Sequence, residues 1–209
     1  MSLQTPKRDC TLCPRLSEFI RKNREQYPDF FNAPVPCFGS QDAKLMIIGL
    51  APGLRGANKT GRPFTKDFAG DLLYSTLSEF GFSRGEYQAD INDGLELTGA
   101  RIVNAVRCVP PQNKVTPDEI RTCNRFLKSE IEHMPKLEVI LTLGTVAHAA
   151  ILKALEYRNG DFKFGHGALH NTRRYKIINS YHCSKYNTST KRLTDEMFKD
   201  VFAKIRTLI

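Results

Sequence analysis

The chain has 209 residues, of which 41% are hydrophobic and 25% are charged. These values are near the averages of globular proteins, so they exclude a disordered or fibrous chain and favour one domain over residues 1–209. The 31 Lys and Arg residues exceed the 22 Asp and Glu residues, which gives a formal net charge of +9. That excess favours a polyanionic partner, and a basic surface that only aids solubility is the alternative.

The amino terminus contains no apolar run after its basic residues, and no apolar stretch is long enough to span a membrane. The sequence therefore predicts a cytoplasmic protein with no membrane contact, which we expect to be a monomer. Thiols stay reduced in that compartment, so the six cysteines are interpreted as metal ligands or buried thiols rather than disulfides.

The first half of the chain alternates helices and strands. Residues 14–25 place their apolar side chains on one helical face. Residues 45–50 form a continuous apolar run that ends in Gly and Pro, typical of a strand buried on both faces. A polar, glycine-rich loop follows, then a helix near 68–80 and a second buried strand at 101–107.

The second half continues the same alternation. Thr116 can cap a helix, Pro117 suits its first position, and Glu119 can complete a capping box. Residues 138–144 predict a third strand, residues 145–157 a helix and residues 174–182 a fourth strand. A polar loop then leads to a final helix opened by Thr194. The pattern predicts an α/β fold, with a four-stranded, mainly parallel sheet flanked by helices on both faces.

Ligands of open parallel sheets bind beyond the carboxyl ends of the strands. The loops expected there span residues 51–66, 107–115, 144–145 and 183–192. Asn104 lies near the end of the second strand, and His182 ends the fourth. Either could be a structural side chain with satisfied hydrogen bonds, but their shared position favours a binding site. An amide side chain such as that of Asn104 can donate hydrogen bonds to the edge of a planar ring and accept them from it.

The loop after the first strand combines glycines, positive charges and one aromatic ring. Its glycines let a ligand approach the backbone, and Phe64 offers a flat face for stacking. The residue order differs from the phosphate-binding G-x-x-x-x-G-K-[ST] loop, which disfavours binding of a nucleoside triphosphate.

Four of the six cysteines fall into two pairs, Cys10 with Cys13 and Cys108 with Cys123. Four thiolates can hold zinc or an iron–sulfur cluster. The first pair is a C-x-x-C motif, and the second is widely spaced, which favours the cluster while zinc stays open. The two remaining cysteines, Cys37 and Cys183, are expected to be buried thiols.

Three segments together carry a resemblance: GLAPGLRGANKTGRPFT (residues 49–65), NAVRCVPPQNK (residues 104–114) and SYHCSKYNTSTKRLT (residues 180–194). With the C-x-x-C-x-R-L pattern from Cys10 to Leu16, they resemble the uracil-DNA glycosylase superfamily, and most of all its iron–sulfur-containing family 5 of bacteria and archaea. The resemblance covers nearly the whole chain. It implies excision of deaminated bases, uracil foremost and also hypoxanthine or xanthine, from double-stranded DNA at the start of base excision repair.

The resemblance also implies roles for individual residues. A 4Fe-4S cluster would be bound by Cys10, Cys13, Cys108 and Cys123 and would pin the amino-terminal segment beside the DNA-binding face. The water and sugar side of the pocket would be formed by Gly49, Leu50, Ala51 and Gly53. Phe64 would stack on the flipped base, Asn104 would bind its Watson–Crick edge, and His182 would face its carbonyl oxygen. Residues 183–192 would enter the duplex.

Two departures from the family pattern stand out. Leu50 occupies a position where family 4 has an acidic residue, which leaves open the group that positions water. Asn58, Thr60 and Asp67 are the candidates, although Asp67 is better explained as a helix cap. The final motif reads His182-Cys183-Ser184 where many relatives have His-Pro-Ser, so its turn can differ in rigidity.

Basic residues on these loops are expected to bind DNA phosphates: Arg55, Lys59, Arg62, Lys114, Lys185, Lys191 and Arg192. Two other function classes fit part of the pattern. A non-catalytic iron–sulfur module for DNA binding or redox sensing would explain the charge and the cysteines, but not Asn104, His182 and Phe64. A zinc-stabilised RNA-binding or RNA-processing protein is the third class.

Overall fold

The computed structural model describes residues 2–209, and its centre is a five-stranded sheet. The strand order is β4-β1-β5-β7-β6. The strands are β1 (Leu45–Gly49), β4 (Ala100–Asn104), β5 (Val139–Leu143), β6 (Leu169–Asn171) and β7 (Lys176–Ser180). All neighbours pair in parallel except β6, which runs antiparallel to β7. Because β1 lies between β4 and β5, successive strands are added on opposite sides of it, which makes a topological switch point.

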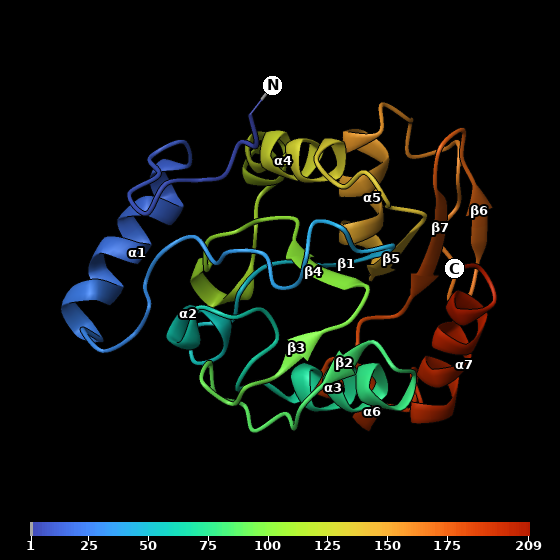
Figure 1. Ribbon diagram of the computed structural model, residues 1–209. Coiled ribbons are helices and arrows are strands. Elements are labelled where there is room, and N and C mark those ends of the chain that lie inside the picture. The colour runs from blue at the N-terminus through green and yellow to red at the C-terminus, as the bar shows by residue number, and fades with distance from the viewer. Residues whose placement is uncertain (1) are drawn as a thin grey trace.

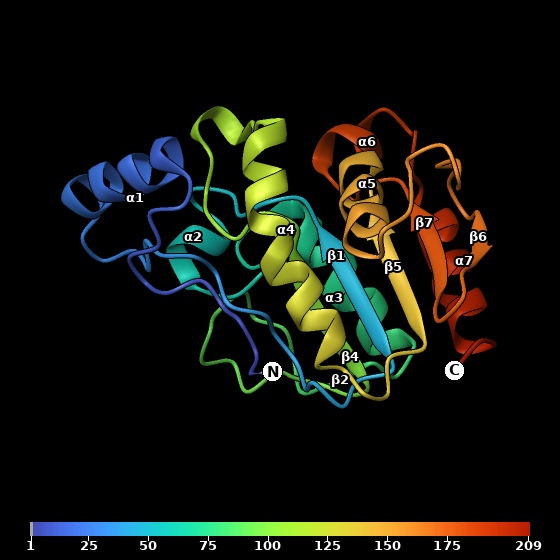
Figure 2. The ribbon, with the colours of Figure 1, turned by 90° about the horizontal axis from the view of Figure 1, so that it is seen from above.

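Helices cover both faces of this sheet (Figures 1 and 2). The helices are α1 (Pro14–Gln26), α2 (Ala57–Thr60), α3 (Phe68–Glu79), α4 (Pro117–Glu132), α5 (Thr145–Ala154), α6 (Lys185–Ser189) and α7 (Asp195–Arg206), with a 3-10 turn η1 (Pro111–Asn113). In Figure 2, α4 and α5 lie in front of the strands, and α3 and α7 lie behind them. A small second sheet pairs β2 (Ser83–Arg84) with β3 (Glu96–Leu97).

The two-sided core follows from the alternation of side chains along the strands. On β1, Leu45 and Ile47 belong to the apolar cluster that contains α3 and α7 residues. Met46 and Ile48 belong to the cluster that contains α4 and α5 residues. Successive strand side chains point to opposite faces, so a strand covered on both faces is apolar throughout.

The predicted α/β fold is confirmed, but the predicted number of strands is wrong. The missed strand, β6, has three residues, and its burial pattern is that of an exposed sheet edge. It therefore lacks the continuous apolar run that marks the other four strands. The second and fourth predicted strands are too long, since β4 ends at Asn104 and β7 at Ser180. The helix predicted to end at 157 ends at Ala154.

The predicted helix starts agree with the structure. Thr116 and Glu119 form a complete capping box at α4. The Thr194 side chain accepts a hydrogen bond from the Met197 amide and caps α7. Asp67 caps α3 by accepting from the Gly70 amide. Each cap satisfies backbone N–H groups that have no partner within the helix.

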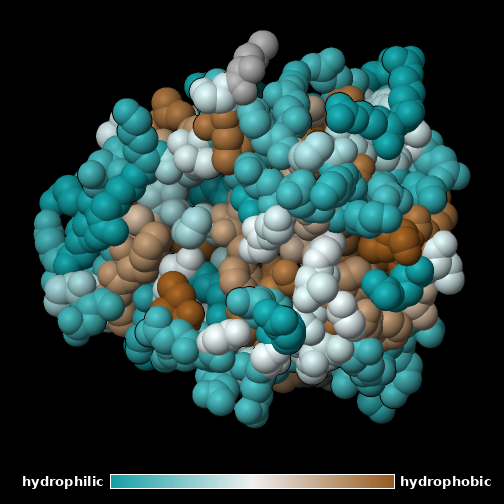
Figure 3. Space-filling view, in the orientation of Figure 1, coloured by the Kyte–Doolittle hydropathy of each residue, from teal (hydrophilic) through white to brown (hydrophobic). Residues whose placement is uncertain are grey.

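The amino-terminal segment is attached to the β4–α4 region. Arg15 donates two hydrogen bonds of 2.8 Å to the carboxylate of Glu119 and one to the Lys114 carbonyl. Leu16 and Ile20 of α1 pack in one apolar cluster with residues of that region. Within residues 2–209, no helix is long and apolar enough to cross a membrane. Figure 3 shows hydrophilic side chains around the rim of this face, with apolar residues gathered across its middle.

Candidate active site

Three of the predicted site residues meet at the carboxyl edge of the sheet. Gly49 and Asn104 are paired at the ends of the neighbouring strands β1 and β4. A Cβ atom on Gly49 would lie 2.6 Å from Cζ of Phe64 and 2.7 Å from Oδ1 of Asn104. Only glycine leaves room for both side chains at this position.

His182 reaches the same place from the segment that follows β7. Its ring centroid lies 6.0 Å from that of Phe64, and the two ring planes are inclined by 27°. The His182 carbonyl accepts a 2.8 Å hydrogen bond from Nδ2 of Asn187, which fixes the backbone on its carboxyl-terminal side. Phe64, Asn104 and His182 therefore converge from three separate parts of the chain, as the sequence predicted.

A cavity of about 370 Å³ opens beside these residues. Its lining comes from four loops: Leu50, Ala51, Pro52, Gly53, Asp67, Phe68, Ala69, Pro110, Asn113, His182, Ser184 and Lys185. The cavity thus includes three of the predicted glycine-loop residues together with His182. Phe64 and Asn104 are not among the lining residues and are only 5% and 4% exposed. Phe64 is connected to the cavity through His182, whose ring centroid lies 6.0 Å from its own.

The environment of His182 favours its neutral form. Burial penalises the charged imidazolium and lowers the pKa of His182 to about 4. At neutral pH the ring is therefore uncharged, with one nitrogen able to donate a hydrogen bond and the other able to accept one.

Asp67 has a second position besides its predicted role as a helix cap. Its Oδ1 accepts from the Gly70 amide at 2.8 Å, and the residue also lines the cavity that contains His182. Burial raises the pKa of this carboxyl group, and the Gly70 amide opposes that shift. Asp67 is the one acidic residue among residues 51–67, so the sequence already singles it out as a candidate for the cavity.

Asn58 is not part of the cavity lining. Its side chain is fully buried, and its Nδ2 donates a 2.9 Å hydrogen bond to Oδ1 of Asn32. Its Oδ1 is buried without a hydrogen-bond partner among the described residues. The role in positioning water that the sequence suggested for Asn58 stays a prediction.

Six of the seven predicted DNA-binding residues are exposed: Arg55, Lys59, Lys114, Lys185, Lys191 and Arg192. Two of them lie over aromatic rings, with Nζ of Lys59 5.1 Å from the Phe30 ring centre and the Arg192 guanidinium 4.6 Å from that of Tyr181. Lys185 lines the cavity.

The prediction for Arg62 is wrong. Its side chain is 4% exposed and makes two hydrogen bonds, of 2.8 and 2.6 Å, with the carboxylate of Asp93. The guanidinium also lies over the ring of Tyr74 at 5.5 Å. A planar, bidentate cation suits such a buried pair, and it leaves no donors for a phosphate on the surface.

The segment 183–192, predicted as a polar loop, contains the short helix α6. This helix presents Tyr186, whose side chain is 72% exposed. At the cavity rim, Phe68 is 46% exposed. Neither aromatic residue stands out in the sequence, because composition and periodicity do not indicate the exposure of a single ring.

The four cysteines of the predicted cluster line one hollow between α1, the β4–α4 loop and α4. Burial and the neighbouring thiols Cys123 and Cys10 raise the pKa of Cys13 to about 11. All four thiols are free of disulfides. In the part of the chain that the structure describes, no group of three or more His, Cys, Asp or Glu side chains is arranged to hold a metal ion.

The two other cysteines differ from each other. Cys183 is buried, as predicted, and its sulfur lies 3.4 Å from the Ala69 carbonyl. Cys37 is only half-buried, and its sulfur accepts a hydrogen bond from the guanidinium of Arg107.

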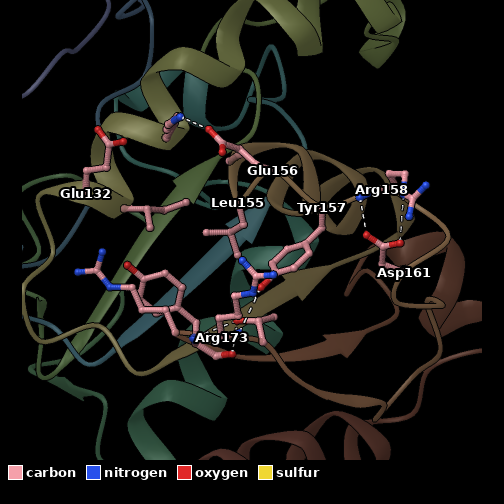
Figure 4. Close-up of a pocket in the computed structure, with 13 residues that line it drawn as sticks. Glu132, Leu155, Glu156, Tyr157, Arg158, Asp161 and Arg173 are labelled. Atoms are coloured by element: carbon pink, nitrogen blue, oxygen red, sulfur yellow. Dashed lines mark hydrogen bonds and ion pairs between the residues drawn. The ribbon is translucent and has the colours of Figure 1, made fainter.

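A larger cavity, of about 680 Å³, lies at the other edge of the sheet (Figure 4). It is lined by the ends of α4 and α5 and by residues that precede β7. Much of its charge is paired internally, since Lys128 pairs with Glu156 and Arg158 with Asp161. None of the predicted site residues lines it.

Comparison with known proteins agrees with this geometry. Residues 36–206 match the Uracil DNA glycosylase superfamily. The Type-5 uracil-DNA glycosylase of Thermus thermophilus is 40% identical over 95% of this chain and 93% of its own length. That of Pyrobaculum aerophilum is 34% identical over 94% and 87%. The crystal structure of Pedobacter heparinus SMUG2 shares the fold, with a TM-score of 0.50 and 12% identity over 100% of this chain and 92% of that one. The chain therefore belongs to the uracil-DNA glycosylase superfamily.

Proposed function

We propose that this protein excises uracil from DNA by hydrolysis of the N-glycosidic bond. The observation that carries the proposal is the convergence of Phe64, Asn104 and His182 beside a cavity of about 370 Å³ at the carboxyl edge of the sheet. The relatives named Type-5 uracil-DNA glycosylase support the same activity.

The reaction requires the damaged nucleotide to leave the base stack, because the glycosidic bond is inaccessible within the duplex. We place the flipped base in the cavity, with Phe64 against its face and the Asn104 amide at its Watson–Crick edge. An amide can both donate to and accept from a base edge. The backbone from Gly49 to Gly53 then lies on the sugar side.

His182 acts on the leaving group. Bond cleavage moves negative charge onto the departing base, and a fixed donor near the base oxygen stabilises that charge. With a pKa of about 4, the imidazole is neutral at pH 7 and serves as a hydrogen-bond donor rather than as a cation.

In this proposal Asp67 would hold the attacking water. Asp67 lines the cavity with His182, and its Oδ1 accepts a hydrogen bond from the Gly70 amide. In this role Asp67 supplies the group that Leu50 lacks. A carboxylate can orient water and stabilise positive charge that develops on the sugar.

The substrate range extends, in this proposal, to hypoxanthine and xanthine. The cavity opens over four loops, and Leu50 replaces the acidic residue of family 4 in its wall. Fewer fixed polar groups against the base make a pocket less selective.

A 4Fe-4S cluster is proposed on Cys10, Cys13, Cys108 and Cys123. The proposal is supported by the lining of one hollow, which contains all four cysteines together with apolar side chains of Leu16, Val106 and Phe126. Bound there, the cluster would supply a structural cross-link between the amino-terminal segment and the loop after β4. Purified protein should contain about four irons per chain. Cys108→Ser should lose them and Cys37→Ser should retain them, whereas zinc in place of iron would contradict the cluster.

Double-stranded DNA would lie over the cavity. Exposed Lys185, Lys191 and Arg192 would contact its phosphates, and Tyr186 on α6 would enter the stack in place of the flipped base.

The test is a panel of duplexes that carry uracil, hypoxanthine, xanthine or thymine opposite each normal base. Purified protein should release free uracil and leave an alkali-labile abasic site, with slower release of the two purines and none of thymine. Intact strands across the uracil duplexes would contradict the proposed activity. Binding without release would favour the non-catalytic DNA-binding module.

A further inference from the structure

The connection between α5 and β6 ends in a turn at residues 165–168 that lies against β7. The Gly167 amide donates to the Asn179 carbonyl at 2.8 Å, and the Asn179 amide donates to the Ala168 carbonyl at 3.0 Å. These bonds continue the antiparallel ladder of β6 and β7 on the amino-terminal side of β6, before Leu169. In an antiparallel pair, every second amide of a strand donates to the neighbouring strand. After Asn179, the next amide expected to donate in this way is that of Tyr181.

At Tyr181 a side chain replaces the backbone as the partner. The Tyr181 amide donates to Nδ1 of His166 at 3.2 Å. The other ring nitrogen, Nε2, lies 3.2 Å from the Met197 carbonyl on α7. An amide N–H can only donate and a carbonyl can only accept, so the two partners fix the neutral tautomer with its proton on Nε2.

The rings add a second contact between the same residues. His166 stacks on Tyr181 with centroids 5.1 Å apart and planes inclined by 21°. The guanidinium of Arg192 lies 4.6 Å from the centre of the Tyr181 ring. The turn thus supports both the backbone before His182 and one residue of the segment proposed to contact DNA.

We propose that His166 is a positioning residue, which holds the chain where it leaves β7 and so places the His182 ring beside Phe64 and the cavity. The inference rests on the proposed role of His182. Hydrogen bonds hold the backbone on both sides of His182. Before it, the Tyr181 amide donates to His166 and the Ser180 hydroxyl donates to the Tyr181 carbonyl; after it, Asn187 donates to the His182 carbonyl. A misplacement of about 1 Å at a reacting group can cost about 100-fold in rate.

The arrangement requires His166 to be neutral, because an imidazolium would present an N–H to the Tyr181 amide. The charged groups that face His166 are Lys204 and Asp200 on α7, and Arg192 lies beyond Tyr181. Burial is the largest effect and lowers the pKa of His166, as does Lys204, while the hydrogen bond to the Met197 carbonyl and the charge of Asp200 oppose them. The bond to Tyr181 is therefore present above that pKa and is lost as the pH falls through it.

Two variants separate positioning from a merely structural role. His166→Leu removes the acceptor, whereas His166→Asn keeps an oxygen near the position of Nδ1 but cannot titrate. His170→Asn is the matched control, since His170 lies on the same sheet edge but bonds the Asn179 side chain, at 3.1 Å, instead of the Tyr181 amide. The measurements are single-turnover excision rates from pH 5 to 8 and the dissociation constant for a uracil duplex.

We expect His166→Leu to slow excision at least about tenfold, with a smaller change in DNA affinity. His166→Asn should stay within about threefold of the native rate and keep that rate on acidification where the native enzyme slows. His170→Asn should keep the native rate and pH profile. A native rate in His166→Leu, or the same acid loss in His166→Asn as in the native protein, would overturn the inference.

Amide hydrogen exchange at Tyr181 tests the inference without activity. Protection should be present in the native protein and in His166→Asn, absent in His166→Leu, and lost by the native protein on acidification. If the native protein releases no uracil, the proposed function fails while this measurement still decides the role of His166. Equal protection in all variants would refute that role.

Discussion

The two edges of the sheet each carry a cavity, and they differ in how their polar groups are used. The cavity at the carboxyl edge measures about 370 Å³ and holds His182, whose imidazole is neutral at pH 7, and Asp67, whose carboxyl group forms no ion pair with the described residues. The opposite cavity measures about 680 Å³, but Lys128 and Arg158 there are paired with Glu156 and Asp161. Cavity size alone would select the edge opposite to the one that we propose as the active site. A reactive site needs polar groups that are held in place yet still free to interact with a ligand.

The same contrast separates arginines within the loop after β1. Arg55 is exposed, whereas Arg62, seven residues later, is buried against Asp93. An arginine in this loop therefore does not by itself indicate a contact with DNA. Arg55 is available to a polyanion, whereas Arg62 stabilises the loop that presents Phe64.

The largest expected effect is the loss of His182. His182→Ala should reduce the single-turnover rate of uracil excision by about 1000-fold, because it removes the donor to the departing base. Asn104→Ala should lower the rate by about 100-fold, since a buried contact to the base edge is lost. Tyr157→Phe, at the opposite cavity, is the control and should keep the native rate. Full activity in both site variants would remove the assignment of the carboxyl edge.

Next in size is the effect of Arg62 on stability. Arg62→Ala should lower the free energy of unfolding by about 3 kcal/mol, because it leaves the Asp93 carboxylate buried without its cation. Chemical denaturation measures this loss, and Arg55→Ala is the matched control with little expected change. An Arg62→Ala protein as stable as the native one would show that the pair contributes nothing.

The contribution of the Arg62–Asp93 pair to the free energy of unfolding should depend on pH. The Arg62 guanidinium lowers the pKa of Asp93 well below its usual range. A carboxyl with a depressed folded pKa contributes stability above its unfolded pKa of about 3.9, and this contribution is lost as the pH falls below that value. The stability difference between native protein and Arg62→Ala should thus be constant from pH 5 to 8 and shrink below about pH 4.

The sequence was sufficient to predict the site residues that lie at strand ends. It was not sufficient to predict which charged side chains are buried. Asn104 and His182 could be placed together because the carboxyl ends of parallel strands share one edge. The sequence could not place Arg62, because its partner Asp93 lies 31 residues away in an irregular segment. Asp67 was correctly predicted as a cap, and only the folded chain places it in the cavity wall. Strand β6 and helix α6 are too short to show a periodic pattern.

A smaller effect is expected from the exposed cations of the segment after β7. The double substitution of Lys191→Ala and Arg192→Ala should lower the slope of log Kd against log salt concentration by about 2, since each cation that meets a phosphate releases about one counterion. Titrations of a uracil duplex between 50 and 200 mM salt measure the slope. Lys44→Ala is the control and should leave the slope unchanged, because Lys44 pairs with Glu138 at the other edge of the sheet. An unchanged slope in the double variant would place both side chains away from the backbone of the DNA.

The smallest effect is expected at the larger cavity itself. Glu156→Gln removes the partner of Lys128, whose Nζ lies 2.5 Å from Oε1 of Glu156. Both side chains are substantially exposed, so water and salt screen their attraction, and the melting temperature should change little and not at all at high salt. Uracil excision should be unaffected, because this pair lies at the opposite edge from His182. A marked loss of excision with an unchanged melting temperature would mean that the larger cavity takes part in the reaction, and pairing of charges would then no longer distinguish the two edges.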